Sequence, residues 1–465
     1  MTPNIKKEIR VRIAPSPTGY LHIGTARSAL FNWLFSKKEN GKFILRIEDT
    51  DLERSEKKFE KDIIESLKWL GLTWDEGPFF QSDRLDIYEK YLRQLLEQNL
   101  AYYCYCTKEE LEDERQAMLS QGMPPKYSGK CRSKVNPKAK EKPQVIRFKV
   151  PETRIAFKDL IRGDISFDTG LIGDIAIAKD LRTPLYNFAV VIDDYEMQIS
   201  HVIRGEDHIA NTPKQMLIQK ALGFSHPHYA HLPLILDPDR SKMSKRYSAT
   251  SISEYRKEGY LPEVMMNFMA FLGWHPKDEK ELMTANEMIE EFDLGRIQKG
   301  GAVFNIEKLN WLNSQYIKNF SNAELVKRIK DFGISVPDRT SKGVSDDQLE
   351  KIAGITKERI KKLSDFSELA DFFFKLPDYS PELLIWKETP KETIKENLEI
   401  VLKLVPDSGK IMKLAEEKGR GEILWPLRAA LSGKMASPGP LEIMNILGEK
   451  EAKSRIKIAI KKLSS

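Results

Sequence analysis

The N-terminal segment constrains the fold most, because two strand-like stretches there flank a loop and a helix. Residues 9–13 alternate between apolar side chains and arginines, which predicts a β-strand with one buried face. A loop punctuated by proline and glycine follows over residues 14–19, and residues 25–35 have the apolar spacing of a helix. Residues 43–47 form the second strand-like stretch. This order predicts a parallel α/β sheet, whose ligands bind at the carboxyl ends of the strands.

The remainder of the chain divides into further parts, since 465 residues are too many for one core. A charged helix begins at Thr107, where Glu110 completes a capping box, and short strand-like pieces follow it. This change of pattern predicts an α+β insertion within the sheet domain. Beyond Ser253 almost every segment has helical spacing. We therefore expect five segments, namely 1–103, 104–184, 185–252, 253–321 and 322–465.

The composition argues against two classes of protein. No stretch approaches the roughly 20 apolar residues of a membrane helix, and residues 1–7 contain no apolar signal core, so we expect a cytoplasmic protein. Three cysteines in such a chain argue against a disulfide framework. A net charge of +6 permits an anionic partner without requiring one, because most basic residues are matched by acidic ones.

The loop after the first strand has the chemistry of a phosphate site. Its glycines let a ligand approach the backbone, and the helix that follows offers unpaired N–H groups to phosphate. His22, beside Gly24, can hydrogen-bond a phosphoryl group whose charge grows in the transition state. Taken alone, a histidine in this position is more often a structural or capping residue.

A second basic motif lies far along the chain, at residues 241–246. Lys242 and Lys245 stand three apart between Arg240 and Arg246, and such a group can neutralise a triphosphate as pyrophosphate departs. Taken alone, a run of this kind is usually a solvated basic loop. Both motifs are expected at the same open edge of one sheet, and this pairing favours nucleotide chemistry over two unrelated loops.

The two motifs together resemble the signature with which class I aminoacyl-tRNA synthetases clamp ATP. Five segments narrow the resemblance to the glutamyl-tRNA synthetase family, namely residues 11–19, 46–51, 74–78, 186–194 and 202–208. The resemblance implies a Rossmann-type catalytic domain with an inserted α+β domain, followed by all-α anticodon-binding domains. It also implies ATP-dependent activation of L-glutamate to glutamyl-adenylate, and transfer of the glutamyl group to the 3′-terminal adenosine of tRNA(Glu).

The same resemblance assigns residues to each substrate. Phosphate stabilisation, with a magnesium ion on the phosphates, is expected from His22, Lys242 and Lys245. ATP is expected to contact Pro15, Ser16, His22, Gly24, Asp207, Lys242, Ser244 and Lys245. Glutamate is expected to contact Arg12, Ala14, Ser16, Glu48, Tyr186 and Arg204, because two carboxylates and an ammonium group call for arginine and for one acid.

Two of these positions, Glu48 and Arg204, have open alternatives. Glu48 and Arg46 alternatively form a strand-edge ion pair, and Arg204 is alternatively a structural residue. Thr25 stands where class I enzymes often carry a second histidine, so the phosphate contact is expected from His22.

The cysteines are expected to lie together in the insertion, where several relatives bind structural zinc. Cys104, Cys106 and Cys131 are the candidate ligands, but Ser133 occupies the position of the usual fourth ligand, a histidine. Tyr127 matches a tyrosine that ligates zinc in the shorter glutamyl-queuosine tRNA(Asp) synthetases. Two alternatives remain open, a zinc site of three cysteines and a tyrosine, or three reduced thiols without metal.

By the same resemblance the insertion holds the acceptor stem, residues 253–321 contact the stem region and residues 322–465 bind the anticodon. Lys357, Arg359 and Lys361 are the basic candidates there. Charging of tRNA(Gln) as well would require a tRNA-dependent amidotransferase downstream, and a monomer is expected. Rival interpretations are a glutaminyl-tRNA synthetase, a nucleotidyltransferase that makes a small-molecule adenylate, and a non-catalytic RNA-binding module. The helical C-terminal region argues against the first two, and the lysine pair with His22 argues against the third.

Overall fold

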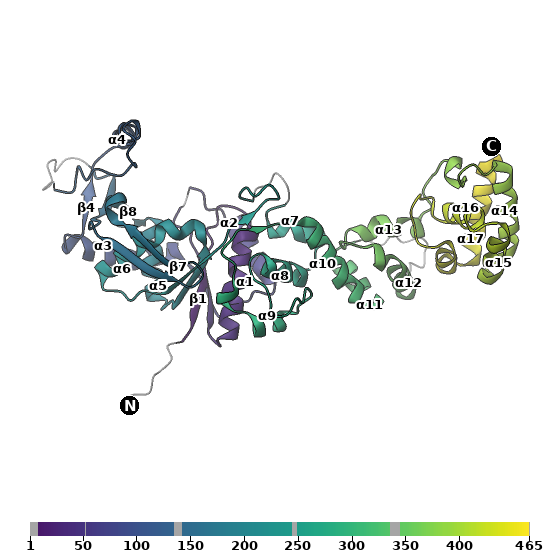
Figure 1. Ribbon diagram of the computed structural model, residues 1–465, viewed down its shortest axis with the longest axis horizontal. Helices are drawn as coiled ribbons and strands as arrows, with labels where there is room; N and C mark the ends of the chain where they lie inside the picture. The colour runs from purple at the N-terminus through teal and green to yellow at the C-terminus, as the bar shows by residue number, and fades with distance from the viewer. Residues whose placement is uncertain (1–7, 52, 134–141, 244–248, 335–344, 465) are drawn as a thin grey trace, which may run out of the picture. The chain divides into compact units, whose positions relative to one another are not determined.

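A computed structural model describes residues 8–51, 53–133, 142–243, 249–334 and 345–464 (Figure 1). The chain forms two compact units. One comprises Met1–Arg256 with Pro262–Ile306, and the other comprises Lys257–Leu261 with Glu307–Ser465. Each unit is described separately below.

The predicted parallel sheet is confirmed at the start of the first unit. Strands β1 (Arg10–Ile13), β2 (Lys42–Ile47) and β3 (Glu76–Phe80) run parallel in that order. They are connected by helices α1 (Ile23–Lys38) and α2 (Lys57–Trp69).

The expectation that β1 has only one buried face is wrong. Arg12 is as deeply buried as its apolar neighbours Val11 and Ile13. Its guanidinium lies against the carboxylate of Asp194, and this ion pair replaces the solvation that an arginine on an alternating strand would otherwise seek.

The second half of the sheet consists of β10 (His201–Gly205) and β11 (His228–Leu232), which are also parallel. Ser200, just before β10, donates its N–H to the carbonyl of Arg10, so β10 lies beside β1. Consecutive strands leave β1 toward β2 on one side and β10 toward β11 on the other. The gap between β1 and β10 is therefore the switch point where α/β sheets bind ligands.

The insertion has its own antiparallel sheet of β4 (Ala101–Cys104), β5 (Val145–Phe148), β8 (Ile175–Asp180) and β9 (Thr183–Pro184). Helix α4 (Lys108–Ser120) begins with the predicted capping box of Thr107 and Glu110, and none of its residues is buried.

A hairpin in the insertion joins the parallel sheet itself. Strands β6 (Arg154–Asp159) and β7 (Gly163–Asp168) pair antiparallel, and β6 meets β11 where Asp159 lies opposite Tyr229. The inserted segment and the second half of the catalytic sheet thus share one sheet.

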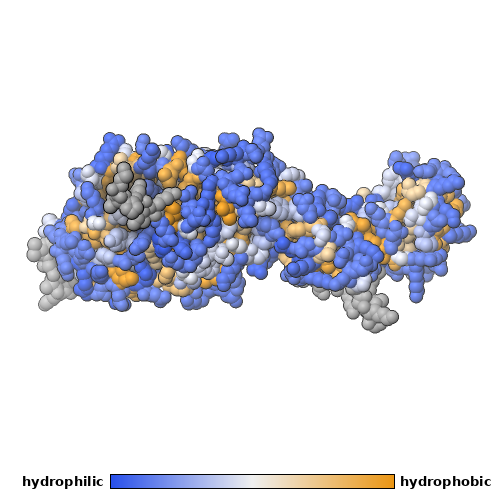
Figure 2. Space-filling view, turned by 90° about the horizontal axis from the view of Figure 1, so that it is seen from below, coloured by the Kyte–Doolittle hydropathy of each residue, from blue (hydrophilic) through white to orange (hydrophobic). Residues whose placement is uncertain are grey.

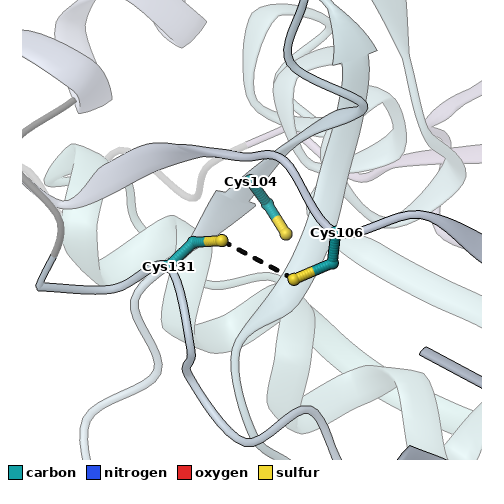
Figure 3. Close-up of side chains that lie close together, drawn as sticks. All are labelled: Cys104, Cys106 and Cys131. Atoms are coloured by element: carbon teal, nitrogen blue, oxygen red, sulfur yellow. Dashed lines mark hydrogen bonds between the residues drawn. The ribbon is translucent and has the colours of Figure 1, made fainter. Parts of the chain in front are cut away.

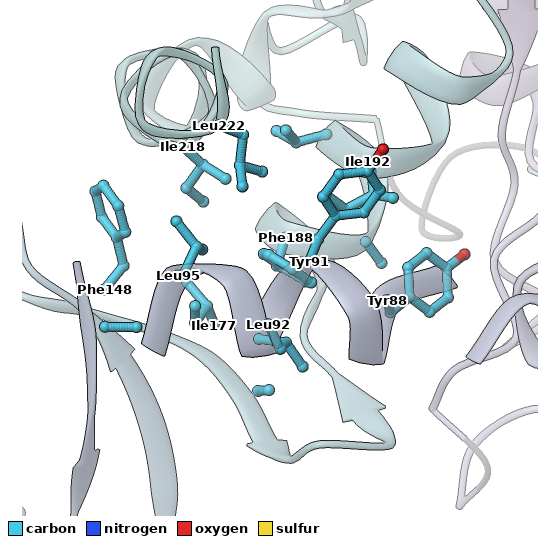
Figure 4. Packing of buried hydrophobic residues seen from close by; sticks show 14 of the residues in the cluster. Tyr88, Tyr91, Leu92, Leu95, Phe148, Ile177, Phe188, Ile192, Ile218 and Leu222 are labelled. Atoms are coloured by element: carbon cyan, nitrogen blue, oxygen red, sulfur yellow. The ribbon is translucent and has the colours of Figure 1, made fainter. Parts of the chain in front are cut away.

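One hydrophobic core connects the insertion to the helices that follow it (Figure 4). Helix α3 (Leu85–Glu97) packs between the antiparallel sheet and the pair α5 (Tyr186–Glu196) and α6 (Thr212–Leu222). This hydrophobic core includes Tyr88, Leu92, Leu95, Phe148, Ile177, Phe188, Ile192, Ile218 and Leu222. Burial of these side chains fixes α5 and α6, which carry polar residues to the site described below.

The chain is mainly helical beyond Ser253, as predicted, and the described residues there contain one short strand, β13 (Ala302–Val303), paired with β12 (Ile235–Leu236). The first unit contains α7 (Ile252–Lys257) at its boundary, α8 (Pro262–Phe271) and α9 (Ala285–Glu291). The second unit contains α10 (Ile306–Asn319), α11 (Asn322–Asp331), α12 (Asp346–Thr356), α13 (Asp365–Phe374), α14 (Lys391–Leu404), α15 (Ser408–Lys418), α16 (Arg420–Ser432) and α17 (Pro440–Ser464). Gly448, with φ of 76°, divides α17 into two helices. Short 3-10 helices cover Gln81–Arg84, Thr169–Leu171, Glu206–Asn211, Leu294–Arg296, Lys357–Arg359 and Pro381–Leu384.

Hydrophilic side chains cover most of the face in Figure 2, and hydrophobic ones form scattered patches. Within the ranges given above, no helix combines the length and apolar character needed to span a bilayer.

Candidate active site

A cavity of about 970 Å³ opens at the switch point of the parallel sheet. Every predicted ATP- or glutamate-binding residue within the described ranges lines it. These residues are Arg12, Ala14, Pro15, Ser16, His22, Gly24, Glu48, Tyr186, Arg204, Asp207 and Lys242. Ser244 and Lys245 lie outside the described residues. The fold thus brings together residues from β1 and the loop after it, the start of α1, the position after β2, the start of α5, β10 with the turn after it, and the segment after β12.

The first wall is the loop that leads into α1. His22 is the N-cap of this helix, and its Nδ1 accepts the N–H of Gly24 at 3.0 Å. The proton of the neutral imidazole is then on Nε2, which can donate to an anion. A side chain at Gly24 would place its Cβ 3.2 Å from that Nδ1, so glycine keeps the cap intact. The capping role predicted as an alternative is therefore present and orients the ring.

Lys242 lines the same cavity from the segment that follows β12. Its ammonium lies 3.8 Å from the carboxylate of Asp207, and both side chains are at least half exposed. Met243 donates its N–H to the carbonyl of Ile235 at 3.1 Å, which holds this segment beside the sheet. An exposed lysine at the mouth of a cavity can exchange its weak ion pair for phosphate.

The floor of the site is a buried network of charges. Asp194 accepts hydrogen bonds from Arg12 (Nε, 3.1 Å) and from Arg46 (Nη1, 2.8 Å). Burial disfavours the charged form of Asp194, but the two guanidinium groups outweigh it and lower the pKa of this carboxyl. Arg46 also reaches Glu48 at 3.2 Å. The ion pair predicted as the alternative for Glu48 exists, and Glu48 lines the cavity as well.

Glu48 differs from Asp194 in its ionisation. Burial raises the pKa of Glu48 to about 6, although Arg46 and Arg12 pull it down. The charged form of this carboxylate is therefore poorly solvated. An ammonium group placed in the cavity would stabilise that charge.

Arg204 is held by neutral groups only. Its Nε donates to His231 Nε2 at 3.2 Å, Nη1 to Gln215 Oε1 at 2.9 Å and Nη2 to Thr212 Oγ1 at 2.8 Å. The side chain is 6% exposed, and within the part of the chain that the structure describes it makes no ion pair. Burial lowers its pKa accordingly. A buried guanidinium with no carboxylate partner is a site for an anion.

Tyr186 closes the wall beside Arg204. Its hydroxyl lies 3.1 Å from His208 Nδ1, and burial raises the pKa of this phenol. The group therefore stays a neutral hydrogen-bonding partner near the cavity.

The three cysteines form a compact group in the insertion (Figure 3). Their sulfur atoms lie within 4.8 Å of one another and are buried, and none forms a disulfide. Tyr127 Oη lies 3.5 Å from Cys104 Sγ and 3.7 Å from Cys106 Sγ, and accepts the N–H of Cys131. Burial raises the pKa of the Cys106 thiol to about 12. Three sulfur atoms this close together are donors that zinc prefers, and the Tyr127 phenol oxygen lies beside two of them.

The predicted anticodon-reading residues lie in the second unit. Arg359 and Lys361 are exposed, whereas Lys357 donates to the carbonyl of Phe320 at 3.0 Å. Arg428 in α16 was not predicted. Its guanidinium lies 4.4 Å from the Trp425 ring, and burial together with the nearby charge of Arg359 lowers its pKa.

Sequence reasoning also missed the residues that hold the site from behind, namely Arg27, Asp159, Thr212, Gln215 and His231. Arg27 lines the cavity and donates to the carbonyls of Leu272 and Pro233. The available signal was a polar residue within an apolar stretch, as for His231 in β11. That signal identifies a buried polar group but not its partner.

Known proteins match nearly the whole chain. Residues 8–311 match the family described as tRNA synthetases class I (E and Q), catalytic domain, and residues 323–460 match an anticodon binding domain. The glutamate–tRNA ligase of Carboxydothermus hydrogenoformans is 47% identical, over 96% of this chain and 99% of that protein. The glutamate–tRNA ligase of Thermodesulfovibrio yellowstonii is 44% identical over 97% and 99%. A crystal structure of a glutamate tRNA ligase from Elizabethkingia meningosepticum in complex with its amino acid superimposes with a TM-score of 0.85, at 35% identity, covering 98% of this chain and 99% of that one.

Proposed function

Because this chain belongs to the glutamyl-tRNA synthetases of class I, we propose the roles that its residues play in joining glutamate to tRNA. The enzyme is a glutamate–tRNA ligase that uses ATP. The α-carboxylate of glutamate attacks the α-phosphorus of ATP and displaces pyrophosphate, and a ribose hydroxyl of the terminal adenosine then displaces AMP from the adenylate. No protein nucleophile is required, so the residues act by positioning and charge stabilisation.

One observation carries the assignment of the glutamate pocket: the cavity is lined both by a buried arginine that makes no ion pair within the described residues and by a buried acid with a raised pKa. Arg204 would take the side-chain carboxylate, and Glu48, whose pKa is about 6, would take the ammonium group. Arg12 already pairs with Asp194, so it would contribute one further N–H beside the α-carboxylate. Tyr186, Ser16 and the backbone of Ala14 complete the pocket.

ATP would occupy the opposite part of the cavity, between the start of α1 and Lys242. His22 Nε2 and the first N–H groups of α1 would donate to phosphate oxygens. Lys242 and Lys245 would neutralise the departing pyrophosphate, and Asp207, Pro15, Gly24 and Ser244 would surround the nucleotide.

Magnesium would enter together with ATP. Among the described residues, the only group of three or more metal-ligating side chains is the cysteine cluster, so this cavity offers no separate carboxylate cage. When bound, the ion supplies positive charge to the phosphate oxygens.

The cysteine cluster fits structural zinc. Cys104, Cys106 and Cys131 would provide thiolates, and Tyr127 would provide the fourth ligand in place of a histidine. A metal at this point would connect β4 to the segment after α4. Helix α4 itself buries no residue, so it cannot stabilise this part of the insertion by packing.

The remaining parts would bind tRNA in the cytoplasm. We assign the acceptor stem to residues 104–184, the stem region to residues 253–321 and the anticodon to residues 322–465, where Arg428 lies over the Trp425 ring and within the influence of the charge of Arg359. Charging of tRNA(Gln) would add an amidotransferase as a partner. The working form would be a monomer.

The decisive experiment is ATP-dependent charging of purified tRNA(Glu) and tRNA(Gln) with radiolabelled glutamate. Charging of tRNA(Glu) alone would show a discriminating enzyme, charging of both would imply the amidotransferase route, and charging of neither by folded protein would refute the function. Arg204→Ala should raise the KM for glutamate by at least tenfold, while Arg93→Ala, which removes an exposed arginine of α3, should not change it. An unchanged KM in Arg204→Ala would remove this residue from the pocket.

A further inference from the structure

Behind Arg204 lies a line of buried hydrogen bonds that ends in the inserted hairpin. Arg204 Nε donates to His231 Nε2, and His231 Nδ1 lies 2.6 Å from Asp159 Oδ2. Asp159 and His231 are 1% and 0% exposed, and Arg204 is 6% exposed. Asp159 is the last residue of β6, so the line runs from the insertion to the cavity wall.

The directions of these bonds fix the state of the histidine. Arginine has only donors, so Nε2 of His231 must accept and the ring proton must sit on Nδ1, where it points to Asp159. A protonated ring would place Nε2–H against Nε–H of Arg204. Burial and the charge of Arg204 lower the pKa of His231, although the carboxylate of Asp159 opposes them. The neutral ring with its proton on Nδ1 is therefore the form that supports Arg204.

The second oxygen of Asp159 makes this arrangement rigid. Oδ1 accepts the N–H groups of Ile161 at 3.0 Å and Arg162 at 2.8 Å, and the N–H of His231 at 3.3 Å. These donors belong to the turn between β6 and β7 and to β11. The carboxylate therefore cannot rotate without breaking several bonds.

The three hydrogen-bond acceptors around Arg204 also determine which of its N–H groups remain for a ligand in the cavity. Of the five N–H groups of a guanidinium, three point to His231, Gln215 and Thr212. One N–H remains on each Nη nitrogen, and these two donors can be offered to the two oxygens of a carboxylate. A glutamine side chain offers one oxygen and one NH₂ group, which would face a donor.

We propose that Asp159 and His231 are positioning residues that hold Arg204 in the orientation selecting the side-chain carboxylate of glutamate. The inference rests on the proposed role of Arg204 as the residue that binds this carboxylate. Selection of the amino acid then depends on a residue of the inserted hairpin that does not itself line the cavity.

Asp159→Asn is the sharpest perturbation. Because backbone N–H groups converge on the Oδ1 position, the amide oxygen of asparagine must stay there and its NH₂ group must face His231 Nδ1. The ring proton then moves to Nε2 and opposes Arg204. We expect the KM for glutamate to rise about 10- to 100-fold, the loss of a hydrogen bond to a charged group, with the KM for ATP unchanged. Asp164→Asn, at an exposed position of the same hairpin, should leave both values unchanged.

Two substitutions at position 231 separate positioning from packing. His231→Phe keeps a ring among Phe157 and Tyr229 but removes the acceptor, and should raise the KM for glutamate as Asp159→Asn does. His231→Gln keeps an acceptor near the position of Nε2 and should stay within a few fold of wild type. In a His231→Gln background, Asp159→Asn should have little further effect.

The tautomer can be observed directly, since the chain has only seven histidines. In ¹⁵N-histidine spectra the resonances lost in His231→Gln identify this ring, and they should show Nδ1 protonated in wild type and Nε2 protonated in Asp159→Asn. If Asp159→Asn and His231→Phe leave the KM for glutamate within twofold of wild type while Arg204→Ala raises it, the positioning role is wrong and the proposed function stands. If Arg204→Ala also has no effect, the proposed role of Arg204 fails first.

Discussion

Glu48, the acid that we propose for the substrate amine, is buried at a cost to the stability of the folded protein, and Glu48→Gln measures that cost. The side chain is 6% exposed, and burial raises its pKa from the usual 4.5 to about 6 even though Arg46 and Arg12 are near. The value is thus the net result of burial and attraction. A glutamine side chain at this position would keep the shape and an oxygen that accepts from Arg46, but it would carry no charge.

The magnitude follows from the two pKa values. A tenfold difference in proton affinity is about 1.4 kcal/mol, so a rise from 4.5 to about 6 corresponds to about 2 kcal/mol. Because the folded state binds this proton more tightly than the unfolded state, the cost is fully present above pH 6 and disappears as the pH falls to about 4.5. The variant should be more stable than wild type by about 2 kcal/mol at pH 7.5 and by less than about 1 kcal/mol at pH 5.

Urea unfolding followed by tryptophan fluorescence at both pH values gives this difference, provided that the same transition is compared in each protein. Glu65→Gln on the exposed side of α2 is the matched control and should show no difference. Charging assays on the same samples should show a raised KM for glutamate. A Glu48→Gln variant that is less stable at pH 7.5, or whose advantage does not shrink at pH 5, would refute the reasoning.

Three other predictions concern separate parts of the chain. Lys245→Ala should lower adenylate formation by about two orders of magnitude with the fold intact, as expected for a group that stabilises only the transition state; near-normal turnover in pyrophosphate exchange would end this role. Wild-type protein should bind one zinc per chain and Cys131→Ser should lose it and melt earlier, whereas full activity in metal-free protein would dispose of a required zinc. Burial and His228 lower the pKa of His201 to about 4, so stability should decline as the pH falls from about 6.5 toward 4. His201→Phe, which fits beside Phe35, should unfold at lower pH than wild type; an identical acid transition would exclude His201 as a cause.

What sequence reasoning predicted depended on how far apart the interacting residues are. The capping box of Thr107 and Glu110 was predicted, and a capping role for His22 was named as an alternative, because both involve neighbours in sequence. The bond between Arg12 and Asp194 spans 182 positions. Alternation along the first strand therefore predicted one buried face with Arg12 on the other, because a pattern of polar and apolar residues says nothing about a distant carboxylate.

In the candidate site, too, contacts between residues far apart in sequence were not predicted. Family resemblance named Arg204 and Glu48 as pocket residues, and the fold brings both to one cavity. Neither resemblance nor spacing indicated that His231 and Asp159 stand behind Arg204, because buried polar partners follow from tertiary packing. The prediction for Lys245 stays a prediction, since this residue lies outside the described ranges.

The pairing of β6 with β11 bears on how such enzymes can be recombined. An insertion that only packed against the catalytic sheet could be exchanged between relatives without changing the residues of the active site. Here the insertion contributes a strand to that sheet and the carboxylate that contacts His231. Chimeras joined outside residues 154–168 would transplant Asp159 together with the surface that we propose for the acceptor stem. Crossover points inside the insertion, before β6 and after β7, would let the proposed tRNA-binding part be redesigned while Asp159, the proposed support of Arg204, comes from the recipient.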